Sequence, residues 1–417
     1  MSGGFDIVIG NPPYLEARSP EYTEDMKINN LTAVKKRIGS DVKYFSKGCD
    51  LLIFFFELSL HILKKNGINA FITQNSWLDT DYGKKFQEYI ANHTEILGIV
   101  DSDYKYFDGP NINTVISFFE GNVNKSKILP FAYYHVNFEK TSVTLSNLSS
   151  IKNSTLVSYK KYDLTQYKDI KWGILLYSTD SFLRIFNILR SKESTKSIKI
   201  GQGLNLSKSQ IIHTKDLLNL NVPKKAWIPF YSKRASFGIE QTDTWLVDCN
   251  QLENNKIADI KSYGLEVYDF NKTSKKPPVL ILPRGIGRHF CALNVLTAYS
   301  DSYVDIYNDD NMLSSEDILN LWCFLNSSIA WLIREISGRK NLGGGMLKAE
   351  ATDLKSFPLL FNFNKQEEIL QIYETIKKRE VSDTINEIET KEHKLIDEIV
   401  FEYIGSVSYT HLRNNFV

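Results

Sequence analysis

Two adjacent prolines in Asn11-Pro12-Pro13-Tyr14 constrain this chain more than any other feature of its sequence. Residues 5–9 (Phe-Asp-Ile-Val-Ile) are mostly aromatic or β-branched, and Gly10 ends that run. A proline fixes its own φ, removes a backbone donor and holds the preceding residue in an extended conformation. The segment therefore predicts a buried strand that leads into a rigid loop, which cannot continue as a helix.

A rigid loop of this kind suits the activation of an amine. The exocyclic amine of a nucleobase is a poor nucleophile because its lone pair is delocalised into the ring. If the Asn11 side-chain oxygen and the Pro12 carbonyl each accept one amine hydrogen, the lone pair is directed outward. Pro13 would keep the loop rigid, and Tyr14 would stack on a base that has left its duplex. The alternative is a proline-rich turn whose tyrosine packs on the core.

The patterns that follow this loop are those of an α/β sheet. A helical period over 50–65 ends at Asn66-Gly67, and a second helix is predicted over 82–92. Strands are predicted over 68–73, 96–100 and 112–119. Strands alternating with helices predict crossover connections, and the last two strands are candidates for a terminal hairpin.

Composition excludes several classes of protein. The chain has 417 residues, of which 42% are hydrophobic and 24% charged, as is usual for globular domains. Its longest apolar run, 51–63, is too short for a membrane span and contains Glu57 and His61, and no secretory signal is recognisable. We expect a cytoplasmic protein without a membrane partner. We also expect no metal site or disulfide, because the cysteines lack CxxC spacing: Cys49, Cys249, Cys291 and Cys323.

The net charge of +1 does not by itself indicate a nucleic-acid partner. Basic residues nevertheless gather in two stretches, 272–288 and 334–348, which are either phosphate-contacting loops or solvated surface. The sequence has two glycine-rich segments, Gly201-Gln202-Gly203 and Gly343-Gly344-Gly345, and neither matches a phosphate-binding loop motif. Nucleotide hydrolysis is therefore unsupported.

The segment from Phe5 to Tyr14 resembles motif IV of the gamma-class amino-methyltransferases of Type II and Type IIG restriction-modification systems. Residues 50–67 resemble the motif V helix, 68–77 the following strand and loop, and 106–116 motif VIII. The resemblance implies methyl transfer from S-adenosylmethionine to N6 of an extruded adenine. It also implies that Phe107 forms an aromatic sandwich with Tyr14, and that Asn11 and Asp50 contact the cofactor. An ordinary loop aromatic is the alternative for Phe107.

The C-terminal half is similar to the TaqI-like specificity domain of the same enzymes. The similarity lies in residues 227–229, 278–284, 325–328 and 354–358. It implies binding of double-stranded DNA through phosphates or purine edges. The basic residues to which this role is assigned are Arg284, Arg288, Arg339 and Lys340.

The resulting fold class is α/β, the C-terminal half of a Rossmann-like S-adenosylmethionine-dependent methyltransferase sheet, followed by a mixed α+β specificity domain and a helical C-terminal segment. One helix is predicted over 315–336 in the specificity domain. The expected segments are a partial catalytic domain over 1–123, a connecting region over 124–196, the target-recognition domain over 197–360, helices over 361–404 and an unassigned tail over 405–417.

The sequence departs from the family upstream of the loop. Such enzymes carry a glycine-rich S-adenosylmethionine loop and an acidic ribose-binding residue on earlier strands, whereas ten residues precede Asn11 and Gly3-Gly4 is no substitute. We therefore expect the main cofactor loop to lie outside this sequence, with a separate chain as a candidate to supply it. No nuclease motif is recognisable either.

Two other functions remain open. The same Asn-Pro-Pro-Tyr chemistry serves protein-glutamine and ribosomal-RNA methyltransferases, but those enzymes do not need the large region after Val123. A non-catalytic DNA-specificity subunit or fragment is the second alternative, and the missing cofactor loop favours it.

Overall fold

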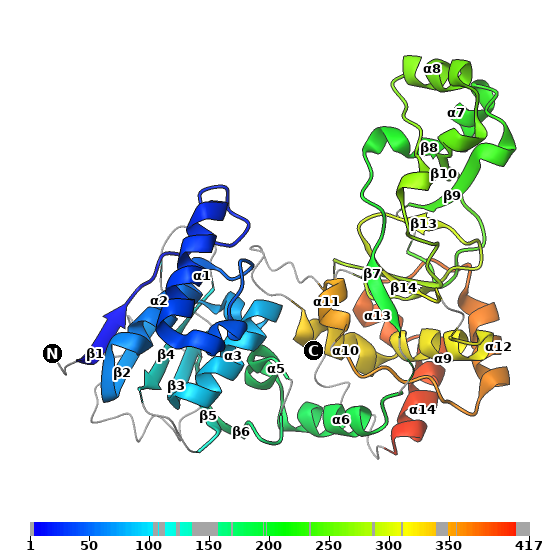
Figure 1. The fold of residues 1–417 in the computed structure, drawn as a ribbon. Helices are drawn as coiled ribbons and strands as arrows, with labels where there is room; N and C mark the ends of the chain where they lie inside the picture. Colours follow the sequence, from blue (N-terminus) through cyan, green and yellow to red (C-terminus); the bar gives the residue numbers. More distant parts are fainter. Residues whose placement is uncertain are drawn as a thin grey trace. The chain divides into compact units, whose positions relative to one another are not determined.

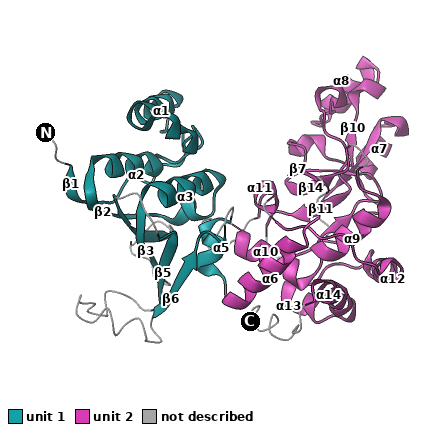
Figure 2. Ribbon diagram, turned by 60° about the horizontal axis from the view of Figure 1, so that its bottom comes forward, with its two compact units in different colours: residues 1–178, 339–345 teal, residues 179–338, 346–417 magenta. Residues whose placement is uncertain are grey.

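The computed structural model describes residues 4–405 except 103–106, 108–112, 122–125, 136–156, 168–169, 195, 197, 233–234, 286–287, 310–311, 339–348 and 356. The chain divides into two compact units (Figure 2). Unit 1 comprises residues 1–178 and 339–345, and unit 2 comprises residues 179–338 and 346–417.

Unit 1 is built on one mixed sheet. Its strands are β1 (Phe5–Gly10), β2 (Leu63–Gln74), β3 (Glu95–Ser102), β4 (Thr114–Glu120), β5 (Ile128–Tyr134) and β6 (Val157–Asp163). The strand order is β1-β2-β4-β3-β5-β6 (Figure 1). β1 pairs with β2, and β3 with β5, in parallel, while the other neighbours are antiparallel. The described helices of this unit are α1 (Glu24–Ile38), α2 (Leu51–Ile62), α3 (Asp81–His93) and α5 (Trp172–Tyr177).

One face of this sheet packs on α2 and α3. The α2 sequence is apolar on most sides, which is typical of a buried helix. Phe56 of α2 is fully buried, and its ring centroid lies 5.0 Å from that of Phe71 in β2 and 5.2 Å from that of Phe86 in α3. Residues of β2 are buried at every second position from Gly67 to Thr73, as expected for a strand with one covered face.

The sheet continues beyond the segment in which we expected it to end. β5 and β6 join it, so the sheet extends past the boundary expected after residue 123, and the division between units follows Ser178. The region 124–196 is thus not a simple connection. In the sequence, short runs such as Ile128–Tyr134 resemble the start of a new β-rich domain. The local pattern does not reveal that β5 pairs with β3 of the first sheet. The coarse expectation of a mixed α/β fold is confirmed.

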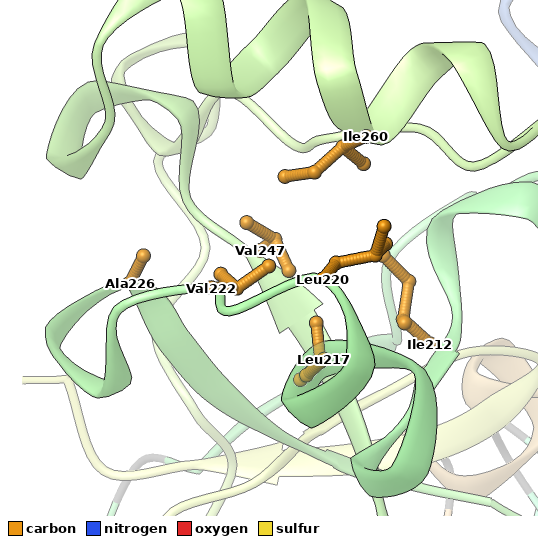
Figure 3. Close-up of a cluster of buried hydrophobic side chains, with 7 residues drawn as sticks. All are labelled: Ile212, Leu217, Leu220, Val222, Ala226, Val247 and Ile260. Atoms are coloured by element: carbon orange, nitrogen blue, oxygen red, sulfur yellow. The ribbon is translucent and has the colours of Figure 1, made fainter.

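Unit 2 contains two four-stranded sheets, ordered β12-β11-β14-β7 and β13-β9-β10-β8. Its strands are β7 (Lys199–Gln202), β8 (Ile212–His213), β9 (Trp227–Tyr231), β10 (Thr244–Val247), β11 (Leu280–Pro283), β12 (Ala292–Leu293), β13 (Tyr299–Ser300) and β14 (Tyr303–Tyr307). The second sheet packs with α7 (Thr214–Asn219) and α8 (Asn254–Ser262) around its own small apolar core, which includes Leu217, Val247 and Ile260 (Figure 3).

The helix predicted over 315–336 is divided into α9 (Ser315–Leu325) and α10 (Ser328–Ser337). Asn326 separates them, since its side chain accepts from the Cys291 amide at 2.8 Å and donates to the Cys291 carbonyl at 3.0 Å. Ser327 then caps α10. The expectation of a single helix was wrong because the apolar period runs through a break that a distant backbone segment stabilises.

The remaining helices of unit 2 are α6 (Asp180–Ser191), α11 (Ala351–Leu354), α12 (Gln366–Ile376), α13 (Thr384–Ile388) and α14 (Lys391–Ile404). The last three fall within the segment that the sequence predicts to be helical. In the described part of the chain, no helix combines the length and apolarity that a bilayer span requires. The same residues contain no group of three or more histidine, cysteine or acidic side chains placed to hold a metal ion.

Candidate functional site

The Asn-Pro-Pro-Tyr loop lies where two parallel strands end. β1 and β2 run in the same direction with Gly10 opposite Phe71, so the residues after β1 lie beside the end of β2. A Cβ at Gly10 would lie 2.9 Å from the Phe71 ring, which explains why a glycine ends β1. In open α/β sheets, ligands bind outside the carboxyl ends of such strands.

The four loop residues differ in exposure. Asn11 and Pro13 are exposed, Pro12 is buried and Tyr14 is half-buried. The Asn11 side chain makes no hydrogen bond to any residue that the structure describes. Its amide is therefore available to an external ligand, and its position is set by the backbone of the two prolines rather than by side-chain contacts.

A cavity of about 450 Å³ lies beside Tyr14. Its volume is within the range of ordinary ligand pockets. Its lining comprises Tyr14, Glu16, Arg18, Ser19, Gln74, Ser76 and Asn113. The Tyr14 hydroxyl and the Gln74 side-chain oxygen are buried here without a hydrogen-bond partner among the described residues, and burial raises the pKa of Tyr14. Neither atom is accessible to water in this structure, so a ligand could bond to them only after neighbouring side chains move.

Phe107, the predicted second ring of an aromatic sandwich, lies close to Tyr14. The two ring centroids are 6.4 Å apart, but the ring planes meet at 71°, an edge-to-face arrangement. Phe107 is 39% exposed. A base held between two parallel ring faces would require one of these rings to rotate.

Asp50 has a different environment from the one expected of a cofactor ligand. Its carboxylate is buried and accepts hydrogen bonds from the Ala17 amide at 2.8 Å, from the Ser76 hydroxyl at 3.3 Å and from the Tyr82 hydroxyl. These donors come from the loop after β1, the turn after β2 and the start of α3. The side chain thus contacts the protein itself in this structure.

Two of the four basic residues assigned to DNA binding carry ion pairs within unit 2. Arg284 donates to both carboxylate oxygens of Glu350, at 2.9 and 2.6 Å. Arg288 donates to Glu380 at 2.9 Å, and both of those side chains are largely exposed. A stretch of sequence without acids does not reveal these partners, which lie 66 and 92 residues away. Arg339 and Lys340 lie outside the described residues.

Six residues that line this cavity were not predicted as site residues: Glu16, Arg18, Ser19, Gln74, Ser76 and Asn113. A usable signal existed for Gln74 and Ser76. Once β1 and β2 are expected to be parallel neighbours, the residues that end β2 must lie beside the loop that follows β1. Arg18 carries no comparable signal, because an exposed arginine near a turn is common.

Comparison with known proteins identifies relatives of parts of this chain and of most of its length. Residues 1–107 match the model of the Eco57I restriction-modification methylase family. The Type II restriction enzyme and methyltransferase RM.Eco57I of Escherichia coli is 25% identical over 167 residues, which cover 38% of this chain and 16% of that protein. The Type II methyltransferase M.AccI of Acinetobacter calcoaceticus is 24% identical over 413 residues, covering 89% of this chain and 73% of that protein.

A solved structure extends the likeness in fold to nearly the whole chain. The Type IIL restriction-modification enzyme MmeI, determined in complex with DNA, is 13% identical and has a TM-score of 0.55. The match covers 98% of this chain and 56% of that one. The chain is thus similar to Type II restriction-modification methyltransferases, and its match to RM.Eco57I covers about a sixth of that protein.

Proposed function

We propose that this chain takes part in methyl transfer from S-adenosylmethionine to N6 of adenine in double-stranded DNA, within a restriction-modification or phage-defence system. The observation that carries the proposal is the cavity beside the rigid Asn-Pro-Pro-Tyr loop, which Tyr14 of that loop lines. Both relatives named above are Type II methyltransferases, and one similar structure was determined with DNA.

The catalytic step would use positioning rather than a general base. The Asn11 side-chain oxygen and the Pro12 carbonyl would accept the two amine hydrogens and direct the nitrogen lone pair toward the methyl donor. Tyr14 would stack on the extruded base, and Phe107 would cover its other face after rotating from its edge-on orientation. Each such stacking contact is worth about 1–3 kcal/mol.

The described residues fit one side of a cofactor site. When bound, S-adenosylmethionine supplies an electrophilic methyl group. Asn11 is exposed at the end of β1 and free to face it, whereas Asp50 is already engaged by three donors from the protein. The remaining cofactor contacts would have to come from other residues.

We place those residues beside the outer edge of β1. Among the described strands β1 pairs with β2 alone, and its side chains Phe5, Ile7 and Ile9 are 60%, 58% and 77% exposed. These three share one face of the strand. Because parallel strands are usually covered on both faces, we propose that a further polypeptide, such as a separate chain, adds to this edge and carries the main cofactor loop.

Arg18 gives a testable link between the cavity and the DNA backbone. It is exposed, lines the cavity and makes no ion pair with a described residue. Arg18→Gln is expected to lower DNA affinity and to reduce the slope of log K against log salt concentration by about 0.9, the loss of one phosphate contact. Fluorescence anisotropy with duplex DNA at several salt concentrations measures the slope.

The matched control for Arg18 is Lys394→Gln, which removes the same charge from α14, where the lysine pairs with Glu389. The control should retain the wild-type slope. Equal slopes in the wild type and the Arg18 variant would remove Arg18 from the DNA interface.

The proposed activity is tested by offering three substrates in competition. The purified chain, and the chain with proteins co-purified from its host, would be incubated with labelled S-adenosylmethionine and equal masses of unmethylated duplex DNA, ribosomal RNA and host protein. N6-methyladenine in the digested DNA is the expected product. Label in RNA or protein alone would instead favour the alternative methyltransferases, and DNA binding without label in either preparation would favour a specificity subunit.

A further inference from the structure

Asp50 occupies the N-cap position of α2, but its side chain does not cap the helix. An aspartate at a helix N-cap normally accepts a hydrogen bond from the second or third helical amide. The Asp50 side chain makes no such bond. The amide of Leu51, the first residue of α2, donates to the Leu15 carbonyl at 2.9 Å. Both the backbone and the carboxylate at this position are therefore directed toward the loop that follows Tyr14.

The carboxylate joins three segments that are far apart in the sequence. Oδ1 accepts from the Ala17 amide, and Oδ2 accepts from the Ser76 and Tyr82 hydroxyls. The Ser76 and Tyr82 oxygens also lie 3.2 Å from each other, within hydrogen-bond distance. Burial and the neighbouring Asp50 charge raise the pKa of Tyr82 well above its usual range, so its hydroxyl remains a donor.

Two of the segments that Asp50 joins form walls of the cavity. Ser76 lines it, and Ala17 lies between the lining residues Glu16 and Arg18 and three residues after Tyr14. A charge-assisted hydrogen bond is shorter and stronger than a neutral one, so a buried carboxylate holds these walls together more firmly than a neutral group would. The Asp50 side chain is thus the direct link between the loop after Tyr14 and the turn after β2, beside the backbone bond from Leu51 to Leu15.

We propose that Asp50 is a positioning residue, which holds the loop after Tyr14 against the Ser76 turn so that the cavity fits an extruded base, and that it does not contact the cofactor. This inference rests on the proposed function. A mispositioning of about 1 Å can lower a rate by about 100-fold even when the altered residue touches no reacting atom.

Asp50→Asn is the main test, because asparagine keeps the shape and the acceptor for Ala17 but loses the negative charge and one acceptor. We expect kcat to fall about 10- to 100-fold. The dissociation constants of S-adenosylmethionine and of duplex DNA should stay within about twofold. Tyr82→Phe, which removes one of the three donors, should lower kcat less. The matched control is Asp397→Asn, a buried carboxylate of unit 2 that accepts from Ser328, and it should leave kcat unchanged.

A second measurement does not depend on catalysis. Amide hydrogen exchange, followed by mass spectrometry of peptides that cover residues 14–19, should be about fivefold faster in Asp50→Ala than in the wild type, because the Ala17 amide loses its acceptor. Peptides from β4, none of whose residues bonds to Asp50, should exchange at the wild-type rate, which would show that the variant is folded.

The possible results distinguish a failure of the proposed function from a failure of the proposed role of Asp50. If the wild-type preparation transfers no methyl group to DNA, the proposed function fails, and loop exchange alone decides whether Asp50 tethers the loop. If transfer occurs and Asp50→Asn weakens cofactor binding while kcat at saturating cofactor is unchanged, Asp50 is a cofactor ligand and the inference is overturned. Unchanged loop exchange in Asp50→Ala would also overturn it.

Discussion

Replacing Asn11 by alanine is expected to lower the rate of the proposed methyl transfer about 100- to 1000-fold, the usual loss when one preorganised polar partner of a transition state is removed. Under the proposed function, the amine of the extruded base would lose one of its two acceptors, and its lone pair would remain delocalised into the ring. DNA affinity should change by less than about twofold, because Asn11 provides one contact out of many in the complex. Folding should be unaffected, since the side chain makes no hydrogen bond to a described residue.

Single-turnover transfer at saturating cofactor and DNA measures this effect without interference from product release. The matched control is Asn92→Ala, which removes the same amide from an exposed position of α3 in the same unit. The control should react at the wild-type rate. An Asn11 variant with wild-type rate, or one whose DNA affinity falls as much as its rate, would show that the catalytic loop has been misassigned.

The second large effect is on stability, at an ion pair between the first two helices of unit 1. Arg37 of α1 donates through Nε to both carboxylate oxygens of Glu57 in α2, at 2.9 and 3.0 Å, and through Nη2 to one of them. The Glu57 side chain is fully buried. Arg37→Met leaves that charge buried without its cation, which should lower the free energy of unfolding of unit 1 by about 3 kcal/mol.

A loss of this size corresponds to a fall of about 6–12 °C in the thermal midpoint of a domain of this size. Differential scanning calorimetry measures it on the transition assigned to unit 1. The double variant Arg37→Met with Glu57→Leu removes both charges and should recover most of the stability, because an apolar pair of similar volume often replaces a buried ion pair without loss. Equal midpoints for the wild type and the single variant would mean that water or another cation compensates Glu57.

What the sequence predicts well in this chain is local. Two prolines fix the backbone of residues 12 and 13 wherever they occur, and the loop is found where the strand pattern ends. The periods of α2, α3 and β2 are likewise carried by consecutive residues. α1 was not predicted because Val34 is its one buried residue, so its apolar period is weak. It is stabilised instead by the Thr23 cap, by charges at both ends and by the Arg37–Glu57 pair.

What the sequence does not predict depends on partners that are distant along the chain. The role of Asp50 becomes visible only when Ala17, Ser76 and Tyr82 are brought to it. The sequence around Arg284 suggests a DNA-contacting residue, whereas the structure pairs Arg284 with Glu350. In each case the sequence identifies a residue of the right type but does not show which distant residue lies beside it. The chemistry could therefore be predicted, but the geometry could not.

The most direct test of the central claim is modified-base sequencing of the host genome. Four strains are compared: one with the intact locus, one with the locus deleted, and deletion strains complemented with the wild-type gene or with Asn11→Ala. Any partner chain encoded elsewhere remains present in all four. We expect N6-methyladenine at one recurrent sequence motif in the intact and wild-type-complemented strains, and its absence from the other two. The same adenine methylation in all four strains would contradict the account.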